Sequence, residues 1–253
     1  MITLTTDFGT LYPAALKGAI LALSPNAKIV DVSHEVPRGN VVAGALFLRC
    51  ASVWFPDAIH VCVLGSEVRG RSRMLVVRTK RGTLVGPDSG VLCPAAEVLG
   101  GGELFELDGT QLWERAQWEM GSGVEYAVAA AMLENGVSPS EMGMPTQSIV
   151  ELTLEHVHLS GEEVHTKVLY VDGFGNLVLA IPNSAALPSG RGTVRGHPFL
   201  LTDSYEQGRL VLYRGTLGFF ELALGGGSAS HLLGVREGDE LVLELSEESG
   251  ASW

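Results

Sequence analysis

Asp7 is the first residue in the chain whose type and position could do chemistry. It lies in Thr5-Thr6-Asp7-Phe8-Gly9, directly after an alternating apolar run that predicts a β-strand. Ligands of open α/β sheets bind beyond the carboxyl ends of strands, and a carboxylate there can accept hydrogen bonds from the two vicinal hydroxyls of a ribose. An Asp in such a turn can equally cap the helix that follows. The motif alone therefore predicts either a ribose-binding carboxylate or a helix cap.

A second candidate is the pentapeptide Asp172-Gly173-Phe174-Gly175-Asn176, which lies between two strand-like runs. The ring of Phe174 can stack on a heteroaromatic base, and the amide of Asn176 offers a donor and an acceptor to an adenine edge. Asp, Gly and Asn are also the residues that favour β-turns. A nucleobase site and an ordinary turn both stay open for this segment.

A third motif, Gly86-Pro87-Asp88-Ser89-Gly90, combines a proline that fixes one dihedral angle with glycines that relax others. By itself it indicates a tight turn.

The histidines and cysteines do not predict a metal site. His156 and His158 alternate on one face of a predicted strand, but no third ligand lies near them in the sequence. Cys50, Cys62 and Cys93 are widely spaced among apolar residues, which predicts buried, reduced thiols. No Gly-x-Ser-x-Gly segment supports a serine nucleophile.

The elements that must position these residues alternate between strand and helix from residue 1 to about 145. Pro13 suits the first turn of a helix, and Gly136 suits the end of one. Strands separated by helices favour parallel pairing through crossovers. The predicted elements are a strand at 2–6, a helix at 13–25, a strand at 28–33, a helix at 40–55, a strand at 58–64, a hairpin at 74–88 and a helix at 124–136.

After Ser148 the sequence changes to short β-rich runs broken by Gly, Pro and Asn, which predicts an antiparallel barrel or sandwich. The runs are 149–159, 162–172, 176–181, 208–214, 218–224 and 240–245. We therefore predict an α/β amino-terminal domain at 1–147, with a mostly parallel sheet and flanking helices. An all-β barrel domain at 148–253 follows it, and residues 143–150 form a short linker.

Composition narrows the class of protein. The 253 residues include 46% hydrophobic residues, enough to bury a full core. The formal net charge is -12, and no stretch concentrates Lys and Arg, so we expect neither nucleic acid nor a membrane as a partner. The first residues do not resemble a secretory signal, and no apolar run approaches the roughly 20 residues of a membrane helix. We expect a cytoplasmic protein.

Taken in order, these segments resemble the S-adenosylmethionine (SAM) hydroxide adenosyltransferase and fluorinase superfamily, nearly from end to end. The stretches that carry the resemblance are TTDFG at 5–9, LKG at 16–18, IVDVSHEVP at 29–37, IHVCV at 59–63, VGPDSG at 85–90, VDGFGN at 171–176 and TLGFFELALGGGSASHLLGVREGDELVLEL at 216–245. The resemblance implies an α/β domain joined to a β-barrel and assembled as a homotrimer. It also implies a small-molecule nucleoside, SAM or adenosine, bound between domains at a subunit interface, with SAM as substrate and no further cofactor.

The resemblance also assigns roles to single residues. Asp7 falls on the family's ribose-binding aspartate. Phe174 and Asn176 fall on its adenine-contacting pair, and Asp172 on the acidic residue just before them. Thr216 stands where the family has a serine that contacts the methionine carboxylate. The implied substrate-binding residues are Asp7, Phe8, Asp172, Phe174, Asn176 and Thr216.

The departures from the family lie in the segments that activate water. Family hydrolases carry VDPGVGT where this chain has residues 64–70, so Gly65 takes the place of the aspartate. The family's active arginine falls near Ser72 or Arg73. A family FHGRD segment is replaced by EMGSG at 119–123.

Two binding features differ as well. The loop after Gly9 is shorter than in the family and lacks a second Asp, which would meet the substrate's ammonium group, and Gly39 replaces a larger residue. Glu67 or Glu119 could supply a base, because a carboxylate in a dry pocket can be tuned for proton transfer. We leave the catalytic residues unassigned.

The sequence therefore predicts a divergent SAM hydrolase homologue that binds SAM or adenosine. Ribose and adenine recognition are kept, while methionine recognition and water activation are lost. In relatives the reaction converts SAM and water to adenosine and L-methionine. Two alternatives stay open: a non-catalytic adenosine- or SAM-binding protein, and an enzyme of another 5′-substituted adenosine, for which Gly39 and Gly65 would leave room.

Overall fold

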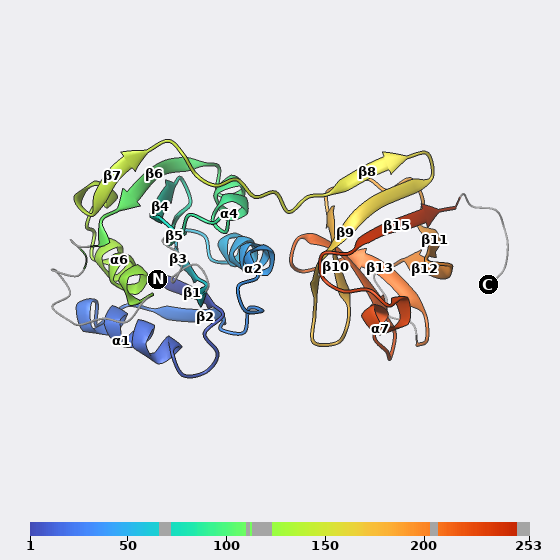
Figure 1. The fold of residues 1–253 in the computed structure, drawn as a ribbon, viewed down its shortest axis with the longest axis horizontal. Helices are drawn as coiled ribbons and strands as arrows, with labels where there is room; N and C mark the ends of the chain where they lie inside the picture. Colours follow the sequence, from blue (N-terminus) through green and yellow to red (C-terminus); the bar gives the residue numbers. More distant parts are fainter. Residues whose placement is uncertain (66–71, 110–111, 113–122, 203–206, 247–253) are drawn as a thin grey trace. The chain divides into compact units, whose positions relative to one another are not determined.

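A computed structural model of the protein describes residues 1–65, 72–109, 112, 123–202 and 207–246. The chain divides into two units, Met1–Thr153 and Leu154–Trp253 (Figure 1), and each has its own cluster of buried apolar side chains. The first unit is α/β and the second is a β-barrel, which confirms the predicted fold class.

The amino-terminal unit is a seven-stranded sheet flanked by helices. Its elements are β1 (Ile2–Thr6), α1 (Pro13–Leu23), β2 (Ile29–Ser33), α2 (Val41–Trp54), β3 (Ile59–Val63), β4 (Met74–Thr79), β5 (Gly82–Pro87), α4 (Cys93–Val98), β6 (Gly102–Leu107), α6 (Val124–Glu134), η1 (Pro139–Glu141) and β7 (Gly143–Thr146). The strand order is β2-β1-β3-β5-β4-β6-β7. The pairs β1–β2, β1–β3 and β3–β5 are parallel, whereas β4, β6 and β7 join antiparallel. The sheet is thus parallel only in the half that contains β1.

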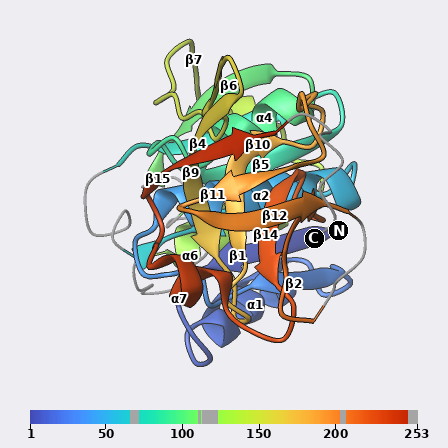
Figure 2. The ribbon, with the colours of Figure 1, turned by 90° about the vertical axis from the view of Figure 1, so that its right-hand side faces the viewer.

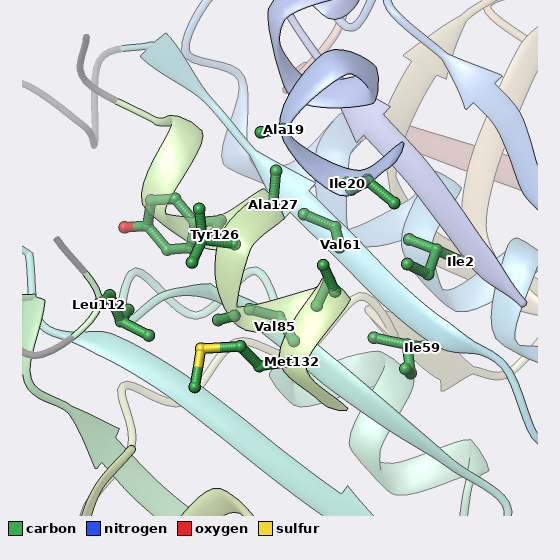
Figure 3. Packing of buried hydrophobic residues seen from close by; sticks show 14 of the residues in the cluster. Ile2, Ala19, Ile20, Ile59, Val61, Val85, Leu112, Tyr126, Ala127 and Met132 are labelled. Atoms are coloured by element: carbon green, nitrogen blue, oxygen red, sulfur yellow. The ribbon is translucent and has the colours of Figure 1, made fainter. Parts of the chain in front are cut away.

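Helices on both sides make β1 and β3 fully buried strands. On one side α1 and α6 pack together over the apolar side chains of β1, β3 and β5, as Figure 3 shows for Ile2, Val61 and Val85. On the other side α2 contacts β1 and β3 and packs against α4. Burial on both faces explains why these strands are continuous apolar runs.

The helix boundaries follow the local signals in the sequence. Pro13 is the first residue of α1, and the Asn40 side chain accepts a hydrogen bond from the Ala43 backbone at the start of α2 (3.0 Å). Gly136, with φ of 86°, follows the end of α6. These predicted helices are confirmed. In the described residues, no helix is long and apolar enough to cross a membrane.

The edge of this sheet differs from the prediction. The hairpin at 74–88 is confirmed as β4 and β5, but β6 was not predicted, and β7 occupies part of the segment assigned to a linker. β7 gives a weak strand signal because it is an edge strand with an exposed Met144 and with Pro145, which cannot donate to a ladder.

The carboxyl-terminal unit is a closed barrel (Figure 2). Its elements are β8 (Val157–Ser160), β9 (Glu163–Val171), β10 (Leu177–Pro182), β11 (Arg191–Val194), β12 (His197–Leu201), β13 (Leu210–Arg214), β14 (Phe219–Leu224), α7 (Ala229–Leu233) and β15 (Glu240–Leu245). Seven strands close through the β10–β9 pair in the order β10-β14-β13-β12-β11-β15-β9, and β8 pairs with the outer edge of β9.

Two details of the barrel correct the prediction. The β12–β13 pair is parallel, so the barrel is not wholly antiparallel. The predicted strand at 149–159 begins only at Val157, and the residues before it form no ladder. Leu154, in the part before Val157, is nevertheless buried. An extended segment that packs one of its two sides against the protein shows the same alternation of apolar and polar residues as a strand, which explains the wrong prediction.

His60 is one of the buried titratable groups of the α/β core. It lies on β3, fully buried, with Nδ1 2.8 Å from the Thr3 hydroxyl of β1. Burial lowers the pKa of His60 to about 4, although a hydrogen bond with the Phe55 backbone acts in the opposite direction. In the unfolded chain the imidazole titrates near its ordinary value of about 6.5.

This difference predicts acid sensitivity of the fold. Between about pH 6.5 and 4 the unfolded chain binds a proton that the folded chain does not, so the free energy of unfolding should fall by about 3 kcal/mol over that range. Urea unfolding at about pH 7.5 and about pH 4.5 measures the loss. The variant His60→Asn removes the titrating group and should show a flatter dependence on pH. Parallel losses in both proteins would exclude His60 as the source.

Candidate functional site

Asp7 lies where the ends of three neighbouring parallel strands meet. It follows β1 directly, and its Oδ1 accepts the backbone N–H of Gly65, which comes two residues after β3 (2.7 Å). Its Oδ2 accepts the backbone N–H of Gly39, in the loop that follows β2 (2.9 Å). The carboxylate is therefore oriented by two loops other than its own.

This arrangement excludes one of the two interpretations of Asp7. Helix α1 begins after Tyr12, and in the described residues no side chain caps it, so the helix-cap interpretation is wrong. An ionised carboxylate offers about four acceptor positions, and the two amides of Gly39 and Gly65 use one on each oxygen. One position on each oxygen is left, which matches the two vicinal hydroxyls of a ribose.

Phe8 is half-buried and belongs partly to the core. A Cβ atom at Gly123 would lie 3.1 Å from its ring, and one at Gly65 would lie 3.7 Å away. Tyr12 meets the ring edge-on, with centroids 6.5 Å apart, and is itself 67% exposed. The glycine at position 123 therefore allows the Phe8 ring to pack closely, whereas a side chain at position 65 would meet the ring at an ordinary contact distance. Tyr12 is an exposed aromatic neighbour that the sequence analysis missed.

A carboxylate near Phe8 was also missed. Glu125 is in the first turn of α6, and its Oε2 accepts the backbone N–H of Gly123 (2.7 Å). Burial raises the pKa of Glu125, although the backbone amides of Glu125 itself and of Gly123 act in the opposite direction. Sequence alone gave no reason to single it out, because an acidic residue in a first helical turn is ordinary.

The segments that depart from the family are only partly described. Glu67 and Glu119 lie outside the described residues. At Gly65, an added Cβ would meet Asp7 and Phe8 only at ordinary contact distances of 3.4 Å or more. Gly65 and Gly39 both contribute a backbone N–H to the carboxylate, so their role here is more than to leave room.

Arg73 has a structural role. Its guanidinium donates to Asp88 (3.1 and 2.5 Å), to Glu106 (2.9 Å) and to the carbonyl and hydroxyl of Ser148 (3.0 and 3.1 Å). The other oxygen of Asp88 accepts the backbone N–H of Val150 (2.7 Å). The turn at 86–90 therefore anchors the segment that leaves the α/β unit, and Arg73 is engaged in that anchor.

The barrel carries the second group of predicted residues in the turn between β9 and β10. Asp172 Oδ1 accepts the backbone N–H groups of Phe174 (2.9 Å) and Asn176 (2.8 Å), and its Oδ2 accepts the Asn176 side-chain amide (2.9 Å). The segment is a hydrogen-bonded turn, and Asp172 organises it. Its role in the described structure is to position Asn176.

The turn presents the aromatic ring outward. The Phe174 side chain is 81% exposed, whereas Asn176 is 8% exposed. The Asn176 side chain also has a second N–H and a carbonyl oxygen, which are the kinds of donor and acceptor that the edge of a nucleobase can pair with. An exposed aromatic ring beside a fixed amide is what stacking plus edge recognition of a base requires.

Thr216 is not brought next to these residues. It lies exposed in the turn between β13 and β14, and Asn183, just beyond the end of β10, holds that turn through the carbonyl of Gly215 (2.7 Å). The turn at 172–176 is at the other end of β10, roughly 20 Å away at about 3.3 Å per residue. A single ligand in contact with both turns of one chain would have to extend along β10 and β14.

Between the two turns lies a buried acid that the sequence analysis missed. Glu221 on β14 is 9% exposed and accepts a short hydrogen bond from the Tyr213 hydroxyl. Burial raises the pKa of Glu221, the Tyr213 hydrogen bond opposes this, and the charge of Asp172 adds to it. A Cβ at Gly215 would overlap the Glu221 carboxyl, so Gly215 allows the close approach.

The other candidates are not sites of the predicted kind. In the described part of the chain, no group of three His, Cys, Asp or Glu side chains could hold a metal ion. His158 faces His165 across β8 and β9 at 6.2 Å, on an exposed hairpin. Cys62 is buried, as predicted, but Cys50 and Cys93 are only partly buried, and all three are free thiols.

The barrel also has a cavity of about 210 Å³ between β11, β12 and β13, lined mainly by apolar side chains such as Phe199 and Leu210. None of the predicted substrate-binding residues lines it.

Comparison with known proteins matches both units. The SAM hydroxide adenosyltransferase N-terminal domain matches residues 2–143, and the SAM hydroxide adenosyltransferase C-terminal domain matches residues 166–242. The chain belongs to the SAM hydroxide adenosyltransferase family. This confirms the resemblance drawn from the sequence.

Relatives in the SAM hydroxide adenosyltransferase family include named hydrolases. The chain is 32% identical over 259 residues to the (R)-S-adenosyl-L-methionine hydrolase of Salinispora tropica, covering 95% of this chain and 96% of the relative. It is 34% identical over 190 residues to the hydrolase of that name from Methanocaldococcus jannaschii, covering 72% and 66%. For these relatives, SAM is the substrate.

Solved structures show the same fold. An uncharacterized conserved protein from Thermotoga maritima matches with a TM-score of 0.86 and 28% identity, covering 96% of this chain and 99% of that chain. A conserved hypothetical protein from Thermus thermophilus matches with a TM-score of 0.74 and 26% identity, covering 96% and 98%.

The turn at 172–176 generates a prediction with a matched control. Gly175 has φ of 82°, and an added Cβ would lie 2.1 Å from the Ser228 hydroxyl at the start of α7. Gly175→Ala should lower the free energy of unfolding by about 1–3 kcal/mol, from backbone strain and forced displacement. Gly173→Ala meets no atom within 4 Å and should be nearly neutral. Denaturant unfolding checks both, and equal effects would contradict this account of Gly175.

Proposed function

We propose that this protein binds the adenosine part of SAM, with Asp7 on the ribose hydroxyls and the turn at 172–176 on the adenine. The observation that carries the proposal is the Asp7 carboxylate, fixed by two backbone amides with one acceptor position left on each oxygen. The exposed ring of Phe174 and the fixed amide of Asn176 support the adenine assignment.

We propose SAM hydrolysis as the reaction class, by analogy with the named relatives. Water would form a bond to the ribose C5′ while the C5′–sulfur bond breaks, releasing adenosine, L-methionine and one proton. The water must be held in line with the departing sulfur, so a base is useful only if it is aligned as well as basic. Glu125 is a described candidate for that base, beside the Glu67 and Glu119 of the sequence analysis.

Thr216 is proposed as a contact for the methionine carboxylate, and Phe8 as a wall beside the ribose. The homotrimeric assembly, the nucleoside site between domains, the boundary at 147/148 and the cytoplasmic location are part of the same proposal. They come from the family resemblance and from composition.

A non-catalytic binding protein is the second candidate. Two observations favour it. Arg73, one of the two positions near which the family's active arginine falls, is bound by Asp88 and Glu106, and position 65, where the family has an aspartate, is a glycine. Both candidates require the same nucleoside contacts, and only the enzyme forms product.

Binding is tested by substituting the carboxylate. Asp7→Asn puts an N–H₂ group opposite a backbone N–H and removes one charge-assisted acceptor, so adenosine affinity should fall about 30-fold or more, close to 2 kcal/mol. Titration calorimetry measures the change. Asp57→Asn makes the same chemical change at an exposed position far along the chain and should leave the affinity intact. Unchanged affinity in Asp7→Asn would sink the ribose assignment.

Catalysis is tested by incubating the protein with SAM and quantifying adenosine by chromatography against a protein-free control. If the protein is a hydrolase, adenosine should exceed the control, and one of Glu67→Gln, Glu119→Gln and Glu125→Gln should lower kcat by about 10²-fold or more with little change in binding. Binding without product would instead assign the non-catalytic role.

A further inference from the structure

Four side chains form a continuous chain from the surface to the end of β1. Lys17 Nζ lies 2.5 Å from Asp31 Oδ2, and Asp31 Oδ1 lies 3.0 Å from His34 Nε2. On the other side of the imidazole, His34 Nδ1 lies 2.9 Å from the Thr6 hydroxyl. Thr6 is the residue before Asp7.

The order carboxylate, imidazole, hydroxyl is the one that activates nucleophiles in hydrolases. Here that role is excluded by burial, because Thr6 is fully buried and its hydroxyl also accepts the backbone N–H of Phe8 (3.3 Å). The contact of His34 with Asp31 is at ion-pair distance but is not aligned as a hydrogen bond. The chain is therefore suited to hold a position rather than to move a proton to a substrate.

This chain of side chains holds the loop at 33–40, which contains Gly39, one of the two backbone donors to the Asp7 carboxylate. Gly9 donates its backbone N–H to the His34 carbonyl (2.8 Å), and Val36 donates to the Thr6 carbonyl (3.2 Å). Three residues beyond Val36, Gly39 donates to Asp7 Oδ2 (2.9 Å). The segment 33–40 is thus fastened along the end of β1, and His34 contributes to it with both its side chain and its carbonyl.

We propose that His34 is a positioning residue for the nucleoside site: it fixes the loop whose Gly39 amide orients the Asp7 carboxylate. The inference rests on the proposed ribose-binding role of Asp7. Asp31 contributes from the far side, where Lys17 keeps it in place. Burial would raise the pKa of Asp31, but the hydrogen bond from Lys17 and the close contact with His34 together outweigh burial, so the pKa lies below its usual value and the carboxylate stays ionised.

Substitutions on strand β1 separate positioning from general stability. Thr6→Val removes the hydroxyl that meets His34 and keeps the side-chain shape, whereas Thr6→Ser keeps the hydroxyl. Thr5→Val is the matched control, because in the described residues the buried Thr5 hydroxyl has no hydrogen-bond partner. His34→Ala removes the imidazole itself.

The readout is amide hydrogen exchange by NMR, which needs no ligand. Thr6→Val and His34→Ala should speed exchange of the Gly9 and Gly39 amides about tenfold relative to the Val61 amide in β3. Thr6→Ser, which keeps the hydroxyl, should exchange these amides as slowly as the unmodified protein. Thr5→Val should leave the ratio unchanged. An equal increase at all three amides, or no change at Gly39, would overturn the proposal.

Adenosine affinity supplies the functional half of the test. Thr6→Val and His34→Ala should bind adenosine about tenfold more weakly, while Thr5→Val binds like the unmodified protein. If the unmodified protein does not bind adenosine, the proposed function fails, and the exchange data still decide whether His34 holds the Gly39 loop. Normal adenosine affinity in His34→Ala, with wild-type binding intact, would overturn the positioning role alone.

Discussion

The carboxylate of Asp7 accepts hydrogen bonds from backbone amides in the loops that follow two neighbouring strands, and the position of both loops at the end of β1 depends on this contact. β1 lies between β2 and β3 in the sheet, so its carboxyl end is the point at which both loops can reach one side chain. A buried or half-buried carboxylate needs such donors, because an unsatisfied charge there costs several kcal/mol. The same contact that stabilises the loops leaves the carboxylate oriented for a ligand.

In the barrel, the carboxylate of Asp172 is also satisfied by hydrogen bonds, but its donors are close to it in the sequence. Asp172 binds the backbone of its own turn, and the turn is further held where Ser230 donates to the Gly175 carbonyl (2.9 Å). The contacts around Asp7 are therefore long-range contacts between loops, while the contacts around Asn176 join residues within four positions of one another in the sequence. We therefore expect a substitution near Asp7 to act through distant loops, and one near Asn176 to act through its own turn.

Polar residues of the family's motifs also have structural work in this chain. In the turn at 86–90, the Asp88 carboxylate accepts hydrogen bonds from the Arg73 guanidinium and from the backbone N–H of Val150. These bonds hold the segment that leaves the α/β unit. His34 connects its own loop to β1. Such contacts stabilise the fold of this chain whether or not it catalyses a reaction.

The amino-acid sequence predicts the two-unit fold, the helices that begin at Pro13 and after Asn40, and the turn at 172–176, and it places Asp7 at the end of a strand. These features follow from local periodicity, capping and turn chemistry, which act over a few residues. Three further features are visible only in the folded chain: Gly39 and Gly65 donate to one carboxylate, Asp88 binds Arg73, and Thr216 lies at the far end of β10 from Asn176. Each of these depends on which strands are neighbours, and neighbouring strands are chosen by the packing of the whole sheet or barrel. The same limit explains two wrong predictions. Strand β7 was predicted to be part of a linker, and the extended segment before β8 was predicted to be a strand. Whether such a segment pairs with a neighbouring strand depends on its partners in the fold and is not visible in its own pattern of residues.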